Sequence, residues 1–375
     1  MPLKRHPAVI GCAIRPLITG RSRSLEEIMY DTALMALADA GITIEDIDGI
    51  VVASNDQFDG RAIAVMMASS AVGGVDRDIL STPSAGEHAF VMGALRIASG
   101  QYRSQLDMAW SPTEVSSMSE AQRLGADPYY NRVLPLDELS AHALQAGALS
   151  HVVPGARAAA EAVADKNRRH GSAAYPTVSP PPGIARWPIG RTMTSGAVTG
   201  AVAMVLAAPD FVAERGAGDV AWLRGMGWAT EAGLLGDRDL ASAPALVEAA
   251  RQAYAMAGVQ PDDVDLAEVT DATPFAELLA YEALGLAGRD EWAARLGDGS
   301  FAQGGRLPVN LSGGVLTHNP VFCTGLIRIA EVAQQIRGKA GAHQHANARL
   351  GLAHAGSGFA MQYQAAVILG QEAPR

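Results

Sequence analysis

The sequence predicts an α/β protein made of two duplicated halves, and three observations lead to that prediction. An apolar strand, an amphipathic helix and a second apolar strand follow one another over residues 8–54, the order of a parallel α/β unit. The stretch "ALADAGITIEDIDGIVVA" returns later as "AYAMAGVQPDDVDLAEVT", with Gly41 matched to Gly258. "GALRIA" at residues 93–98 returns as "GLIRIA" at residues 325–330. Two echoes in the same order indicate an internal duplication.

Each element of the first unit has its own local signal. Short apolar runs predict strands over residues 8–14 and 47–54. Between them, Ser24 stands three residues before Glu27, which is the spacing of a capping box, and Gly41 is a suitable helix stop. We therefore expect a helix between the two strands. Its expected apolar face comprises Leu25, Ile28, Met29, Ala33 and Leu34.

The boundary between the halves is expected within "AERGAGD", which gives an N-terminal half of residues 1–215 and a C-terminal half of residues 216–375. The Pro- and Gly-rich stretch "HGSAAYPTVSPPPGIARWPIG" interrupts the first half and predicts an irregular loop excursion over about residues 115–193. The basic stretch "KNRRHG" within this excursion is interpreted as solvated surface charge.

Composition excludes some classes of function. The chain has 375 residues, of which 49% are hydrophobic, so it is long enough for two cores. A net charge of −10 argues against binding the nucleic-acid backbone, which needs a basic face. The sequence lacks an apolar run of about 18 residues and a signal-peptide pattern, so we expect a cytoplasmic protein without a membrane span. The two cysteines, Cys12 and Cys323, have no zinc-site spacing, and no metal site is predicted.

Four segments together resemble the thiolase superfamily, and within it the sterol-carrier-protein-type thiolases and lipid-transfer-like enzymes. "EVTDATPFAELLAYEALGL" resembles that branch's Glu-Leu-His-Asp segment, and "GGRLPVNLSGGVLTHNPVFCTG" resembles the segment with the Gly-His-Pro loop. "LGLAHAGSGFAMQYQAAVILG" resembles the closing glycine loop, and "GALRIASGQYRSQLDMAW" the helix and strand after the nucleophile. The resemblance implies a thiolase fold in five αβαβα layers, a homodimer and an acyl-CoA substrate. Coenzyme A is then part of the substrate, and no tightly bound cofactor is expected.

The resemblance places the family's nucleophilic cysteine at Pro83, where this chain has no cysteine within reach. Ser84 is a candidate replacement, but a serine needs a strong neighbouring base, and it is also a plausible helix cap. Glu87 and His88 are ionisable groups close to the same slot. Cys323 is weighed as a relocated nucleophile and interpreted as a packing residue.

The family's two histidines are also replaced. One falls on Thr270, before Asp271, and the other on Asn319, with His318 in the preceding glycine slot. Threonine is no base at pH 7, whereas the Asn319 amide can donate to an oxyanion. His354, in the closing glycine loop, is a candidate acid or base. Backbone positions that we expect to border the ligand are Gly314, Gly356, Ser357 and Gly358.

Three functions remain open. The first is retro-aldol cleavage or formation of a carbon–carbon bond in an acyl-CoA, which the resemblance associates with members that lack the cysteine. It needs a base for a β-hydroxyl and donors for the enolate oxygen, but no thiolate. The second is acyl transfer with Ser84 or Cys323 as the nucleophile, and the third is a non-catalytic acyl-CoA-binding subunit. The resemblance also implies a small OB-fold zinc-ribbon partner protein.

Overall fold

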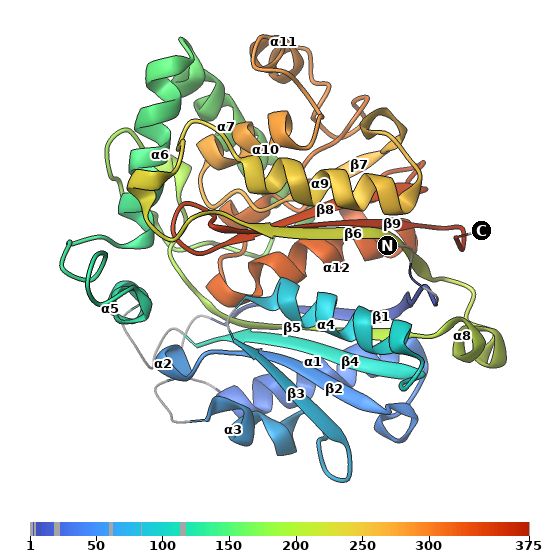
Figure 1. Cartoon of the computed structure of the whole chain (residues 1–375). Helices are drawn as coiled ribbons and strands as arrows, with labels where there is room; N and C mark the ends of the chain where they lie inside the picture. Colours follow the sequence, from blue (N-terminus) through green and yellow to red (C-terminus); the bar gives the residue numbers. More distant parts are fainter. Residues whose placement is uncertain are drawn as a thin grey trace.

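Five layers of secondary structure are stacked in the computed structural model, which describes residues 3, 5–18, 23–59, 63–83, 85–112 and 118–374 (Figure 1). Within these residues, nine strands form one sheet in the order β3-β2-β4-β5-β1-β6-β9-β8-β7. The strands are β1 Ala8–Ile18, β2 Gly49–Ser54, β3 Asp78–Pro83, β4 Ser104–Ser111, β5 Thr199–Ala207, β6 Ala221–Thr230, β7 Leu266–Val269, β8 Leu350–Ser357 and β9 Tyr363–Gly370. The predicted fold class, an α/β thiolase fold of two duplicated halves in αβαβα layers, is confirmed.

The two halves of the sheet repeat one arrangement. Read from its outer edge inward, the first half has the order β3-β2-β4-β5-β1 and the second has β7-β8-β9-β6, so every strand of the first half except β3 has a counterpart in the second. The two halves join through a short β1–β6 pairing at Ala8 and Val9. A parallel bridge between Ala267 and Val309 lies where the first half has β3. Both sequence echoes fall on matching elements, at the junctions before β2 and β7 and on α4 and α12.

The helices form three layers around the two halves of the sheet (Figure 1). Two of them, α4 and α12, lie in the middle and share one apolar core with both halves of the sheet. Helices α1 and α3 cover the outer face of the first half, and α7, α9 and α10 that of the second. The bounds are α1 Leu25–Ala40, α2 Asp56–Asp59, α3 Ala64–Ala71, α4 Gly86–Ser99, α5 Met118–Gly125, α6 Glu138–Val152, α7 Ala156–Ala174, α8 Pro209–Arg215, α9 Pro244–Ala257, α10 Pro274–Ala283, α11 Trp292–Gly297 and α12 Thr324–Ile336.

Helix α1 begins and ends as its local signals predict. Ser24 Oγ accepts from the Glu27 amide at 3.1 Å, and the Glu27 carboxylate accepts from the Ser24 amide at 2.7 Å. Gly41 ends the helix in the left-handed region with a φ of 68°. One residue of the predicted apolar face is wrong. Leu34 is 44% exposed, because it lies about half a turn around the helix from Leu25.

The excursion of the first half is more ordered than predicted. It contains α5, α6 and α7, and its described residues outside regular helices and strands are mainly 126–137, before α6, and 175–190, after α7. Helix α7 packs against α10 and α11 of the second half. Its Lys166 and Asn167, from the stretch interpreted as surface charge, are 4% and 0% exposed. The interpretation is wrong for these two side chains, which bind buried carboxylates, whereas Arg169 of the same stretch is exposed. The half boundary near residue 215 coincides with the end of α8 and stays a prediction.

No helix in the described part of the chain combines the length and apolarity needed to cross a membrane.

A carboxyl group without a partner lies in the core of the first half. Asp107, on β4, is 0% exposed, and neither carboxyl oxygen has a hydrogen-bond partner among the described residues. It packs on Gly93 of α4, where a Cβ would lie 2.2 Å from Oδ2. Burial raises the pKa of Asp107 well above its ordinary value, against the opposing charge of Arg96. The fold therefore favours the neutral acid at this position.

We expect Asp107→Asn to stabilise the protein increasingly as the pH rises. The native state holds the Asp107 proton more tightly than the unfolded state, so the wild type loses stability as the pH rises above 3.8, the group's ordinary pKa. The asparagine variant has no such loss. Urea unfolding at pH 5 and pH 8 measures the difference, with Asp290→Asn on the surface as the control. An equal difference at both pH values would contradict the prediction.

Candidate functional site

The two central helices touch at their first turns. A Cβ at Gly86, the first residue of α4, would lie 2.7 Å from the Cβ of Leu326 in α12. A Cβ at Gly325 would lie 2.2 Å from Oε2 of Glu87. Neither position therefore has room for a side chain, and glycine permits the close approach. Two helix N-termini, each carrying partial positive charge, thus meet beside the Glu87 carboxylate.

Glu87 is buried, and only one of its two carboxylate oxygens has a hydrogen-bond partner among the described residues. The residue is 1% exposed, and Oε1 accepts from the Ser357 hydroxyl at 2.8 Å. Oε2 has no hydrogen-bond partner within the described parts of the chain. A buried polar atom without a partner is uncommon and calls for an explanation, which a functional role can supply.

His88 follows Glu87 and faces the same loop. Its ring meets that of Tyr363 edge to face, with centroids 6.2 Å apart. The ring is partly buried, and Nδ1 has no partner among described atoms. The loop between β8 and β9 therefore lies over the start of α4, and Ser357 and Tyr363 flank it. We name Glu87, His88, Gly325, Ser357 and Tyr363 the helix-junction cluster.

His354 lies outside this cluster. Successive residues of a strand point to opposite faces, and Ala355 and Ser357 point toward Gly325 and Glu87. His354 consequently points to the other face of β8, where Nε2 lies 2.8 Å from Oε1 of Gln364. It is 0% exposed, and burial lowers the pKa of His354 to about 4. The structure does not bring this predicted acid or base to the cluster.

The two glycines of the closing loop lie against side chains of the loop itself, and their expected place beside a ligand stays a prediction. A Cβ at Gly356 would lie 2.5 Å from Cε of Met361, so the loop's own side chain fills that space. Gly358 has a φ of 75° and lies against the Tyr363 ring. These glycines serve the packing and turning of the loop.

Thr270, Asp271 and Gly314 belong to a second, fully internal set of contacts. Thr270 Oγ1 donates to the backbone carbonyl of His354 at 3.2 Å. The Asp271 carboxylate accepts from the Val315 amide at 2.7 Å and from Asn167 Nδ2 at 2.8 Å. Gly314 has a φ of 64°, and a Cβ there would lie 2.2 Å from Oδ1 of Asp271. Burial, with the nearby Glu277, raises the pKa of Asp271 to about 7.

A buried polar network continues from Asp271, and the sequence analysis missed it. Asn167 Nδ2 also donates to Glu277 Oε2 at 2.6 Å, and Lys166 Nζ pairs with Glu277 Oε1 at 2.9 Å. Asn310 Nδ2 donates to the same carboxylate at 2.8 Å. The signal was present in "PFAELLAYEALGL", where Glu277 lies within an apolar stretch at the start of a helix. A buried carboxylate there requires a cation, and α7 supplies Lys166.

His318 is likewise internal. It is 1% exposed, and its ring meets the Tyr175 ring edge to face at 4.4 Å. Neither ring nitrogen has a partner in the described structure, and burial lowers the pKa of His318 to about 4. The Tyr175 hydroxyl donates to Glu331, which also contacts His343 Nε2 at 2.9 Å. His318 therefore packs on this buried group and not on the helix-junction cluster.

Asn319 and Cys323 hold the loop in place. Asn319 Nδ2 donates one of its two amide hydrogens to the carbonyl of Ser195 at 2.8 Å, and its role as an oxyanion donor stays a prediction. Cys323 is 0% exposed, and its Sγ lies 3.6 Å from the carbonyl of Gly200. Burial raises the pKa of Cys323 well above its usual range, which favours the interpretation as a packing residue. Ser84 lies outside the described residues.

Other features of the molecule lie away from the cluster. A surface cleft of about 470 Å³ lies at the N-terminal ends of β2 and β3. Helix α4, in contrast, begins beyond the C-terminal end of β3. It is lined by Glu45, Ile47, Asp48, Val75, Asp76 and Arg77. Among the residues that the structure describes, no group of three His, Cys, Asp or Glu side chains is arranged to hold a metal ion.

Parts of the chain are similar to known proteins. Residues 229–371 match the thiolase C-terminal domain-like family. An acetyl-CoA acetyltransferase of Methanothermobacter thermautotrophicus is 40% identical over 118 residues, 31% of this chain and 31% of that protein. Human sterol carrier protein 2 is 40% identical over 108 residues, 28% of this chain and 20% of that protein. The match thus spans less than a third of either relative.

Solved structures are similar over nearly the whole chain. An Ltp2–ChsH2 aldolase has a TM-score of 0.81 at 20% identity, covering 97% of both chains. A monomeric SCP2-thiolase-like protein of Mycobacterium smegmatis has a TM-score of 0.72 at 20% identity, covering 98% of this chain and 78% of that one. At such identities the likeness concerns the fold.

We expect neither cysteine of the folded protein to react quickly with a thiol reagent. Burial raises the pKa of Cys12 to about 11 and that of Cys323 well above its usual range, and the thiolate is the reactive form. Titration with Ellman's reagent at pH 8 should label no thiol within minutes and both thiols in guanidinium chloride. Rapid native labelling of Cys323, suppressed by acyl-CoA, would instead restore it as a nucleophile.

Proposed function

We propose that this chain, a member of the thiolase superfamily that resembles the sterol-carrier-protein-type thiolases, cleaves or forms a carbon–carbon bond in an acyl-CoA without an acyl-cysteine intermediate. One observation carries the proposal. A buried carboxylate with a free oxygen, Glu87, lies at the start of α4, and both cysteines of the chain are internal thiols elsewhere. The relatives' names include an acyltransferase and an aldolase, and this arrangement favours the chemistry that needs a base over the chemistry that needs a thiolate.

The helix-junction cluster has the groups that a retro-aldol cleavage needs. Glu87 would take the proton of the β-hydroxyl, the Cα–Cβ bond would break, and an aldehyde or ketone would leave. The electron pair passes to the thioester, whose enolate oxygen is stabilised by first-turn amides of α4 or α12. The enolate then takes a proton at Cα, from Glu87 or from His88, and yields the shortened acyl-CoA. Ser357 holds the Glu87 carboxylate in one orientation.

We propose that coenzyme A enters only as part of the substrate and that the active assembly contains a homodimer and a small OB-fold zinc-ribbon protein. The structural neighbour, an Ltp2–ChsH2 aldolase, is named for two components, which supports a search for such a partner. The same partner would complete the substrate channel, so activity of the chain alone and of the pair should both be measured.

We expect the protein to convert a β-hydroxyacyl-CoA into an aldehyde or ketone and a shortened acyl-CoA. Mass spectrometry of the reaction, with and without the candidate partner, measures both products. The absence of cleavage across short, branched and steroid side chains would contradict the lyase and favour an acyl-CoA-binding subunit. An acyl mass on Ser84 or Cys323 would favour acyl transfer.

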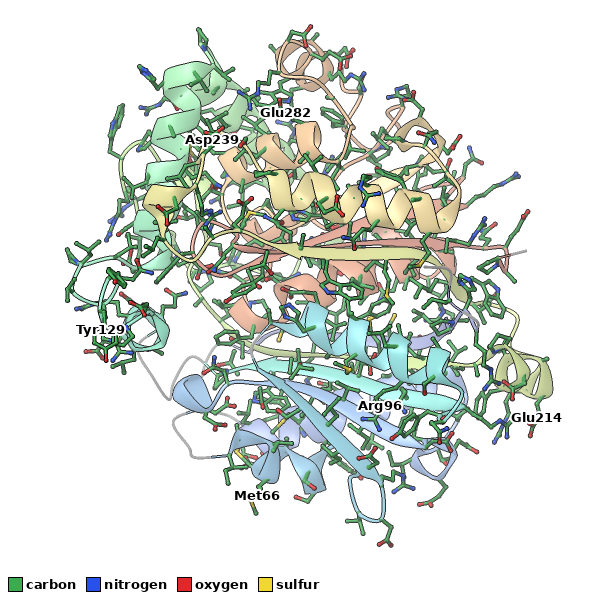
Figure 2. All side chains as sticks on the ribbon, viewed as in Figure 1. Met66, Arg96, Tyr129, Glu214, Asp239 and Glu282 are labelled. Carbon is green, nitrogen blue, oxygen red and sulfur yellow. The ribbon has the colours of Figure 1, made fainter. Side chains whose placement is uncertain are left out.

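We expect Glu87→Gln to lower kcat by about 100-fold or more, with KM changed by less than about threefold, because general-base catalysis is lost while the shape is kept. The glutamine can still accept the hydrogen bond from Ser357. The matched control is Glu282→Gln, an exposed carboxylate on α10 that Figure 2 labels at the outer surface. Unchanged turnover in a folded Glu87→Gln protein would remove Glu87 from the mechanism.

A further inference from the structure

The loop between β8 and β9 has a backbone conformation that its residues seldom adopt. Gly358, Ala360 and Met361 have φ angles of 75°, 47° and 56°. Glycine adopts this left-handed region freely, but in alanine and methionine the Cβ crowds the backbone there. Two such residues in succession persist only where the surroundings enforce the turn. The groups that enforce it are therefore of interest.

Arg238 holds the turn from another part of the chain. Its Nη1 donates to the carbonyl of Phe359 at 2.7 Å, and its Nη2 donates to the carbonyl of Ala360 at 2.8 Å. The arginine follows β6 in the chain, and its neighbour Asp239 is labelled in Figure 2. Its side chain is 4% exposed, with Glu231 Oε2 3.9 Å from Nε. A planar guanidinium presents two separate nitrogens in a fixed geometry to two successive carbonyls, whereas an ammonium presents all its donors from one nitrogen.

Two further side chains complete the support. Gln145, on α6 of the excursion, donates to the carbonyl of Ala360 at 3.4 Å. Gln364, on β9, donates through Nε2 to the carbonyl of Met361 at 2.6 Å. Because Gln364 uses its amide hydrogens there, its Oε1 accepts from His354 Nε2. We name Arg238, Gln145 and Gln364 the loop brace. His354 supports this brace, because its hydrogen bond to Oε1 holds the side chain of Gln364 in place.

The other side of the same loop faces the helix-junction cluster. Ser357, just before the turn, donates to Glu87, and Tyr363, just after it, packs on His88. Five residues separate the two, so the path of the turn determines where both side chains lie. A turn that relaxed to ordinary φ values would move Ser357 relative to the Glu87 carboxylate.

We propose that Arg238 is a positioning residue for Glu87: by holding the carbonyls of Phe359 and Ala360, it keeps the turn left-handed and Ser357 on the Glu87 carboxylate. Its effect on turnover rests on the proposed function, whereas its effect on the loop does not. The two effects can therefore be tested separately.

The loop is tested by hydrogen–deuterium exchange of the full-length protein. In Arg238→Ala, exchange of the amides in residues 355–364 should rise by about tenfold or more, because local opening becomes easier. Arg238→Lys, which keeps the charge but offers its donors from a single nitrogen, should give an intermediate increase and covers the case in which the alanine variant does not fold. The control is Arg295→Ala, since Arg295 also donates to a backbone carbonyl, that of Leu286, far from the loop. Wild-type exchange in both Arg238 variants would overturn the proposal.

Positioning is tested by kinetics with the β-hydroxyacyl-CoA that the wild type cleaves. In Arg238→Ala, kcat should fall by about tenfold to 100-fold with KM within about threefold, because the base is misplaced while binding is kept. Guanidinium ion should restore part of the loss in Arg238→Ala and none in Glu87→Gln. A loosened loop with unchanged kcat would overturn the positioning role. A wild type inactive on every substrate would sink the proposed function, while the exchange result would still decide whether Arg238 holds the loop.

Discussion

The contact between the first turns of α4 and α12 is the constraint on which the rest of the structure depends. Two helices buried between the halves of the sheet can share one core only if they approach closely, and glycine at residues 86 and 325 permits this. The approach brings two partial positive charges together, which is unfavourable in a dry interior. The Glu87 carboxylate lies between them and offsets that repulsion. The buried Glu87 carboxylate thus stabilises the fold and also serves the proposed chemistry.

In the second half, too, buried charges are paired with charges of opposite sign. The Glu277 carboxylate is fully enclosed, and removing Lys166 would leave its charge without a counter-charge. Arg328 and Glu268 form a second enclosed pair at 2.7 Å. Several polar residues that look catalytic in the sequence belong to such networks. Their contacts hold the loops around the cluster in place.

Local signals predicted much of the fold. The capping box of α1, the left-handed stop at Gly41 and the echoes on matching elements depend on near neighbours in sequence, which the sequence displays directly. The residues of the candidate site were harder to predict from the sequence, because their contacts depend on which face of a strand or helix each residue occupies. His354 and Ser357 are three residues apart and point to opposite faces of β8, and nothing in "HAGSGF" distinguishes a reacting group from a supporting one. Arg238 had no local signal at all, since its partners are more than 120 residues away.

The excursion has a consequence for protein engineering. It is inserted in the first half, yet α7 supplies the cation and the amide that the second half's Glu277 requires, and α6 reaches the turn beside Glu87. A chimera that exchanged either half with a relative's would separate charges from their counter-charges. A chimera that preserves these contacts must therefore take α6 and α7 from the same parent as α10 and the last two strands. In such an exchange the excursion belongs with the C-terminal half, although the chain order assigns it to the other one.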